Sequence, residues 1–385
     1  MVHKPTMRSG RLVALLLAGI LGGATGLARA QTIILSPSLA VSEEYDDNVL
    51  LSPTDRQSDF VTSVSPGLRL AIREYPWDVT LAASARAVYY LDRPDLNSTT
   101  DNQNGTLTIQ YRPTPRFTAS LTDTFTRSLN PGEVDPEAGI ITGRFRSFSN
   151  TAAPALSYQI TPLTRIRLDY AFRIFRSDSP LAEESDTHEA GLFVEREFTP
   201  RTSGTLRYTF SYFQPENEPA RDVHSPRVGL IHALSPTIRV SAEAGVLLLE
   251  NANGSTQVLP AGTFRYDQEY SRGRFSLAYD RSARLAGLIG EVGTTQSLTA
   301  TVSFLATRAL TVSLDSGARA TESLDTAEDF RVYTAGIRLD YRLLEWLSVN
   351  AAYQYMRQDD RTGPLDLERN VVFLGLTAST DVRMY

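Results

Sequence analysis

Residues 164–176 alternate strictly between apolar and polar side chains, and this period of two most constrains the fold. One parity holds Ile166, Leu168, Tyr170, Phe172 and Ile174, and the other holds Arg165, Arg167, Asp169, Ala171 and Arg173. Successive side chains of a β-strand point to opposite faces, so the segment predicts a strand with one apolar face and one charged face. Such a strand suits a wall between lipid and water.

Similar alternation recurs down the chain, for example over residues 79–91, 206–212, 238–248, 298–304 and 333–341. No segment after residue 30 has the run of about 20 apolar residues that a membrane-spanning helix needs. Only helices and closed barrels satisfy their backbone hydrogen bonds within lipid. The sequence therefore predicts an all-β fold, a transmembrane antiparallel up-and-down β-barrel.

Short turns and long polar segments alternate between these runs. The eight short turns lie near residues 75–77, 113–115, 161–163, 199–201, 235–236, 270–273, 307–309 and 344–345. The nine long segments lie near residues 46–58, 92–101, 130–143, 177–185, 214–222, 251–256, 285–293, 323–329 and 358–366. Seventeen connections predict 18 strands, with 16 as the alternative, and both termini on the side of the short turns.

The first 30 residues have the pattern of a secretory signal peptide. Lys4, Arg8 and Arg11 precede an apolar run over 12–27, and residues 28–30 form a small-x-small cleavage site. We expect residues 1–30 to be removed and residues 31–385 to form the barrel. The chain has no cysteine, which excludes lipid attachment at an N-terminal cysteine. Export without such an anchor predicts a location in the bacterial outer membrane.

The exported part of the chain is acidic. Residues 1–30 hold four of the 38 basic residues, which leaves 34 arginines against 44 acidic residues and a net charge of −10. This balance gives no support for nucleic acid as a partner. The expected partners are outer-membrane lipid, lipopolysaccharide and the barrel assembly machinery, for which Tyr385 fits a terminal aromatic signal. Because Asp381 and Arg383 share the parity of Tyr385, we expect the last strand to span about residues 369–379.

Aromatic residues gather at the ends of the runs. Trp77 and Trp346 lie beside short turns, while Tyr45, Phe60 and Phe148 lie toward long segments, as in the two interfacial girdles of a barrel. The alternative is that aromatics are simply favoured in strands. One residue breaks the apolar parity: Asp123 requires either a bulge in its strand or a position above the hydrocarbon.

Two motifs resemble those of a known family. Residues 44–51 (EYDDNVLL), 59–61 (DFV) and 65–68 (SPGL) resemble the start of the β-barrel porins encoded beside bacterial exopolysaccharide and capsule clusters. The turn at 158–163 (YQITPL), echoed at 198–200 and 234–236, is similar to the same group. The resemblance implies an outer-membrane channel that exports a secreted polysaccharide, with polysaccharide export proteins as partners. It brings no catalytic residues with it.

If the apolar parity faces lipid, the opposite parity lines a water-filled lumen. The predicted pore-lining residues are Arg69, Arg86, Arg165, Arg167, Asp169, Arg173, Arg207, Arg239, Glu243, Arg265, Asp267, Arg338 and Asp340. Arginines in a bore favour anions and bind carboxylates with a planar fork of donors. We therefore predict passive passage of polar or anionic solutes. The alternative is that arginine–carboxylate ladders only brace the wall.

Other chemistry has little support. The acidic cluster at residues 43–48 matches no EF-hand spacing and suggests a solvated loop, or one bridged to lipopolysaccharide by divalent ions. His188, His224 and His232 have no zinc-ligand spacing. We therefore predict no metal site, no cofactor and no enzyme activity.

Two other readings of the chain remain. One is a structural barrel with a plugged bore, for which residues 128–146 are the candidate inward segment. The other is a soluble periplasmic β-repeat binding protein such as a propeller, because the turns recur about every 37 residues.

Overall fold

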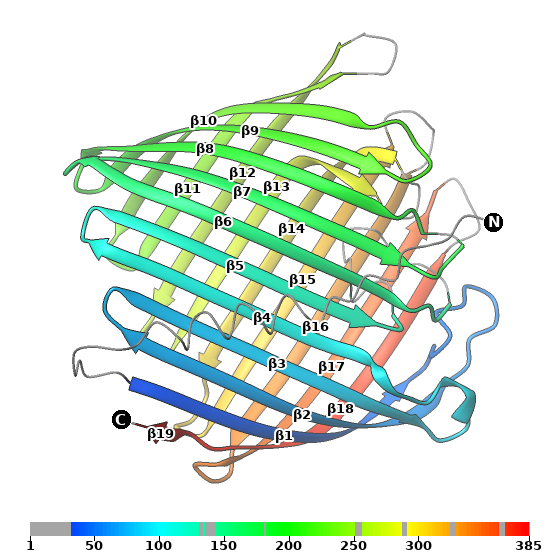
Figure 1. The fold of residues 1–385 in the computed structure, drawn as a ribbon. Coiled ribbons are helices and arrows are strands. Elements are labelled where there is room, and N and C mark those ends of the chain that lie inside the picture. The colour runs from blue at the N-terminus through cyan, green and yellow to red at the C-terminus, as the bar shows by residue number, and fades with distance from the viewer. Residues whose placement is uncertain are drawn as a thin grey trace, which may run out of the picture.

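The computed structural model describes residues 32–130, 134, 143–180, 182–250, 256–286, 291–323, 329–361 and 366–384. The predicted signal peptide, Tyr385 and most of the candidate inward segment at 128–146 lie outside these residues. Figure 1 shows the described chain as one barrel of tilted strands. No helix among the described residues has the length and hydropathy of a membrane span.

Eighteen long strands build the wall, with one short 3₁₀ helix, η1 (Pro94–Leu96), in the second long connection. The strands are β1 (Thr32–Asp46), β2 (Asp59–Glu74), β3 (Trp77–Tyr90), β4 (Ser98–Thr114), β5 (Phe117–Ser128), β6 (Ser147–Thr161), β7 (Thr164–Ser177), β8 (Ser185–Thr199), β9 (Thr202–Pro215), β10 (Arg221–Ser235), β11 (Ile238–Glu250), β12 (Thr256–Tyr270), β13 (Gly273–Ala286), β14 (Glu291–Leu305), β15 (Leu310–Ser323), β16 (Asp329–Arg342), β17 (Leu347–Asp360) and β18 (Leu367–Ser379). A nineteenth strand, β19 (Val382–Met384), has three residues.

The sheet closes between its first and last strands. Each long strand pairs antiparallel with its chain neighbours, and β1 pairs with both β2 and β18. The β1–β18 register runs from Ser38 opposite Ser379 to Asp46 opposite Val371. This closure confirms the predicted 18-strand up-and-down barrel. The alternative count of 16 and the propeller reading are both wrong.

The predicted turns are confirmed, because each of the eight short connections falls where the sequence placed it. Proline occupies the first turn position at Pro162, Pro200 and Pro236, where its fixed φ favours a tight turn and its missing N–H costs no ladder bond. Pro76 is the second residue of its turn and follows a cis peptide bond. The last long strand ends at Ser379, as expected. The residues after it do not form a free tail, because β19 pairs with β1, with Met384 opposite Ile33.

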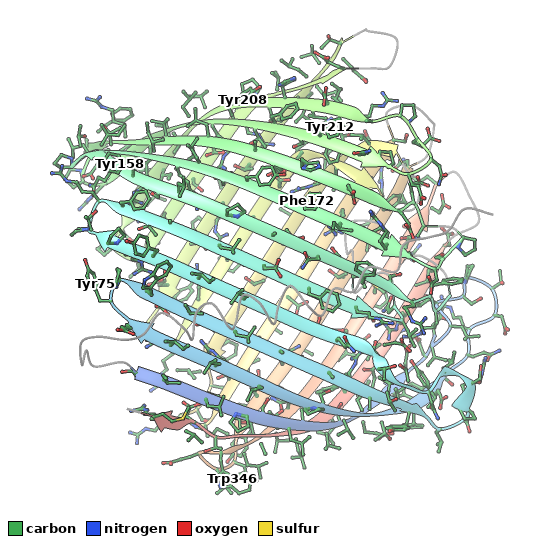
Figure 2. The ribbon with its side chains drawn as sticks, viewed as in Figure 1. Tyr75, Tyr158, Phe172, Tyr208, Tyr212 and Trp346 are labelled. Carbon is green, nitrogen blue, oxygen red and sulfur yellow. The ribbon has the colours of Figure 1, made fainter. Side chains whose placement is uncertain are left out.

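The two faces of the wall differ as the alternation predicts. Large apolar side chains are exposed on one face, among them Leu168, Leu206, Leu230 and Leu374. Rings lie near both rims of this outer face: Trp77 and Tyr111 have centroids 4.4 Å apart beside short turns, and Tyr45 and Phe60 have centroids 5.2 Å apart toward the long connections. Figure 2 shows Tyr75 and Tyr158 at the rim of the short turns and Tyr212 nearer the other rim, while Phe172 and Tyr208 lie along the middle of the wall.

Asp123 keeps its outward parity without a bulge. It lies opposite Leu107 on β4 and Ala152 on β6, and neither pairing shifts register at this position. Asn150 of β6 donates a hydrogen bond of 3.2 Å to the Asp123 carboxylate. The bulge explanation is therefore wrong, and a neighbouring amide on the outer wall satisfies the carboxylate instead.

Candidate pore lumen

All thirteen residues predicted to line the pore lie on the face opposite the exposed apolar side chains. Cross-strand pairing groups them on this inner face: Arg167 lies opposite Phe193, Phe193 opposite Arg207, and Arg239 opposite Asp267. On the other side of the barrel, Arg338 lies opposite Ser313 and Asp340 opposite Asn350. The period of two places every member of a strand's polar parity on this face at once.

The four predicted carboxylates of this face each lie against an arginine or amide side chain. Arg167 lies 3.2 Å from Asp169, and Arg207 lies 3.1 Å from Glu243. Asp267 accepts from Arg265 at 2.6 Å and from Arg274 at 3.2 Å. Asp340 accepts from the Asn350 amide at 2.6 Å. Three of the four carboxylates are therefore paired with at least one arginine.

Four of the predicted arginines have no such partner. Arg69, Arg165, Arg239 and Arg338 are exposed on the inner face, and within the described part of the chain none makes an ion pair. Arg86 and Arg173 do interact with other residues. A guanidinium is always protonated, so these four unpaired arginines carry positive charge that the four predicted carboxylates, engaged with other donors, do not pair with.

Glycines in neighbouring strands let the charged side chains lie flat against the wall. The Asp169 carboxylate on β7 rests over Gly191 of β8, where a Cβ would overlap its Oδ2 atom. Glu243 of β11 crosses β10 at Gly229 to reach Arg207 and Thr205 on β9, and a Cβ at Gly229 would lie 2.7 Å from its Cγ. The absence of a side chain at these positions keeps the carboxylates out of the bore.

Substituting Gly191→Ala is expected to push the Asp169 carboxylate off the wall and break its contact with Arg167. The cost in unfolding free energy should stay near 1 kcal/mol, because the displaced group is the end of a side chain facing water. The freed carboxylate would lower the preference for anions. Urea midpoints and reversal potentials check the two effects, and Gly105→Ala, where a Cβ has room, is the control.

Two recesses adjoin along the inner wall. The larger, of about 780 Å³, extends over β4–β9 and includes Arg112, Arg116, Arg165 and Arg167. The smaller, of about 490 Å³, extends over β8–β13 and includes Arg227. Arg112, Arg116 and Arg227 were not among the predicted pore-lining residues, because a proline next to each of them interrupts the local alternation.

The first long connection, residues 47–58, folds inward at the rim of the long loops. Val49 and Leu51 are fully buried. Val49 packs against Val61, Val88 and Tyr90 of the inner face. Leu51 packs against Leu367 and Met356. Most of the predicted inward segment, 128–146, lies outside the described residues, so that prediction stays untested.

The acidic cluster predicted to be a solvated loop is partly buried, so that prediction is wrong for Asp46 and Asn48. Arg369 donates to both Asp46 oxygens, at 3.0 and 2.7 Å, and lies 3.4 Å from Glu44. Arg144 lies 3.5 Å from Asp46 and also donates to the Val49 carbonyl at 2.7 Å. These contacts fasten the inward segment across the seam between β1 and β18.

The three histidines among the described residues lie apart from the inner face. His188 and His224 accept or donate with the hydroxyls of Tyr170 and Tyr208, at 2.7 and 2.6 Å, among the outward aromatics. His232 pairs with Thr202 at 2.9 Å. No cluster of metal-ligating side chains occurs in the ranges that the structure describes.

Comparisons with known proteins give only a distant likeness. No family model matches the chain, and no curated protein matches it. Among solved structures, the chain is similar to OccAB4 of Acinetobacter baumannii (12% identity, TM-score 0.47, covering 91% of this chain and 98% of that one) and to OccK5 (OpdH) of Pseudomonas aeruginosa (12%, 0.47, 94% and 100%). It is also similar to a BenF-like porin from Pseudomonas fluorescens (10%, 0.46, 90% and 99%). Likenesses at this level are too low to indicate a function.

Proposed function

We propose that this protein is an outer-membrane channel for the passive passage of small polar solutes, with a preference for anions. The observation that carries the proposal is the unequal pairing on the inner face. The carboxylates of Asp169, Glu243, Asp267 and Asp340 are held by donors, whereas Arg69, Arg165, Arg239 and Arg338 have no anionic partner in the described residues. Fixed charge of one sign along a pore raises the local concentration of ions of the other sign.

Charge reversal at these four arginines is expected to invert the selectivity. In planar bilayers under a potassium chloride gradient, the wild-type protein should be more permeable to chloride than to potassium. Its reversal potential should therefore have the sign of the chloride equilibrium potential. A variant with all four arginines replaced by glutamate should give the opposite sign. The matched variant with four lysines keeps the charge and should behave as the wild type. Cation selectivity of the wild type, or the absence of conductance, would overturn the proposal.

A plugged structural barrel is the second candidate, and the inward segment at residues 47–58 favours it. Val49 and Leu51 occupy space at the rim that solutes would otherwise cross. The same bilayer recordings decide between the two candidates. A folded barrel, identified by its heat-dependent mobility in electrophoresis, that gives no conductance steps would favour the plug.

Export of a secreted polysaccharide is a narrower hypothesis that rests on the motif resemblance at residues 44–68. A polymer would have to pass the rim that Val49 and Leu51 narrow, so this hypothesis requires the inward segment to move. We propose as partners lipopolysaccharide and the barrel assembly machinery. The export hypothesis adds polysaccharide export proteins. A channel needs no catalytic residue, and we propose no cofactor.

A further inference from the structure

We propose that the wall has a lateral opening between β12 and β13, through which molecules with a hydrocarbon chain pass between the lumen and the lipid. The inference goes beyond the proposed passage of polar solutes along the bore. The opening lies in the half of the wall next to the long connections. A flap, made of residues 282–286 of β13 and 291–294 of β14, covers it from the inside.

The strands β12 and β13 separate before they end. Their ladder starts at the short turn and stops at Gly262 opposite Arg281. β12 continues beside β11 to Thr256, and β13 continues beside β14 to Ala286. Among the described residues, 256–261 of β12 therefore have no ladder partner on the side of β13. Figure 1 shows the yellow end of β13 and start of β14 curving away from the straight strands beside them.

The flap lies against the inner wall. Ala283 and Val292 are buried, although the parity of Val292 faces lipid farther down β14, where Leu298 is 47% exposed. Both pack into an apolar cluster on the inner wall of β9–β12. The wall members of this cluster are Phe213, Val223, Leu247, Leu249 and Ala261. Side chains of the outward parity meet the inner wall because the end of the hairpin bends into the barrel.

The apolar cluster connects the lumen with the edge of β12. At one end, Val223, Leu247 and Ala283 line the smaller recess of the bore. At the other end, Leu259 on the unpaired stretch of β12 packs against the cluster. Its neighbour Val258 is 59% exposed on the outer face. An apolar path therefore leads from the recess to the lipid-facing wall.

This path suits a single-chain amphiphile with an uncharged head. The chain would leave water for the apolar cluster, which is favourable in proportion to the apolar surface removed. The head would hydrogen-bond the backbone groups of residues 256–261, which a membrane wall tolerates only within protein or beside a water-filled cavity. An added peptide strand fits less well, because Pro260 offers no N–H to a ladder.

Tryptophan fluorescence in lipid vesicles tests the opening without any ion current. Trp77→Phe and Trp346→Phe remove both native tryptophans, and Leu259→Trp then adds a single reporter on the inner side of the unpaired edge. Phospholipids with brominated acyl chains should quench most of its fluorescence, because the chains reach it through the opening. Val332→Trp is the matched control, because Val332 has the inner parity but β16 is paired on both sides there. It should keep its fluorescence.

Val292→Asp tests the flap. A charge in the apolar cluster should release the flap and raise several-fold the rate at which bacterial cells take up N-phenylnaphthylamine, an uncharged apolar dye. Val332→Asp, at a buried apolar position away from the flap, should leave the rate unchanged. Val292→Ala replaces Val292→Asp if that variant lacks the heat-dependent mobility of a folded barrel.

Equal quenching of Leu259→Trp and Val332→Trp, or equal dye uptake by the flap variant and Val332→Asp, would overturn the lateral opening. Chloride conductance of the wild type is measured separately, so failure of the opening and failure of the channel function are distinguishable.

Discussion

Arg369→Ala is expected to lower the unfolding free energy by about 3–5 kcal/mol, the cost of leaving a buried charge without its partner. Arg369 makes two hydrogen bonds to Asp46, whose side chain is fully buried, and a third to Glu44. Without it, Asp46 keeps a hydrogen bond of 2.9 Å from the Asn48 backbone N–H and the Arg144 contact at 3.5 Å. The loss falls on the seam between β1 and β18, where the chain closes on itself, so the closed barrel as a whole should weaken.

The control is the neighbouring pair of Arg56 and Glu368, whose side chains are 42% and 38% exposed. Arg56→Ala should cost less than about 1 kcal/mol, because water already solvates both groups. Urea unfolding of both variants in lipid vesicles, followed by heat-dependent mobility, gives the comparison. Equal destabilisation by the two substitutions would show that the Asp46 pairing does not secure the seam.

The strand architecture could be predicted from local sequence because its causes are local. The alternation around Leu168 fixes which side chains share a face, and Pro162 and Pro200 end the strands on either side of it. Once both are known, antiparallel pairing of chain neighbours follows, and with it the count of strands. Closure by β1 and β18 then follows from the rule that a barrel in lipid leaves no strand edge.

The buried network at the seam could not be predicted, because its partners lie far apart in sequence. Asp46 and Arg369 are separated by 323 positions, and nothing local to residues 43–48 distinguishes a buried carboxylate from a solvated one. The inward fold of residues 47–58 was missed for a related reason. Val49, Leu50 and Leu51 gave the only local signal, three apolar side chains in an otherwise polar loop.

The inner face shows the same division between local and distant causes. Parity alone places Arg207 and Glu243 on one face, but it does not show which arginines are paired. Glu243 reaches Arg207 across β10 only because Gly229 leaves room, and that requires the register of three strands. Phe193 was likewise not predicted to line the pore. In the sequence it is only an apolar exception to the polar alternation of its strand, and the recess that it lines is known only from the structure.

Leu168→Arg is expected to destabilise the barrel by about 2–4 kcal/mol, the cost of a cation near the middle of the lipid-facing band. Leu168 is 52% exposed on the outer face and is the fifth of the 14 residues of β7, between Leu156 and Leu192 of the neighbouring strands. An arginine there has acyl chains on its open side and no carboxylate opposite it. Unfolding by urea in lipid vesicles measures the difference.

Ala171→Arg introduces the same side chain on the same strand three residues later, on the opposite parity. Ala171 lines the larger recess and lies opposite Glu189, so the new guanidinium would face water and a carboxylate. It should change the unfolding free energy by less than about 1 kcal/mol, as most solvent-facing substitutions do. A larger loss of unfolding free energy in Ala171→Arg than in Leu168→Arg would mean that the face of Ala171, and not that of Leu168, contacts lipid. The assignment of Arg165, Arg167 and Arg207 to the pore would then be wrong.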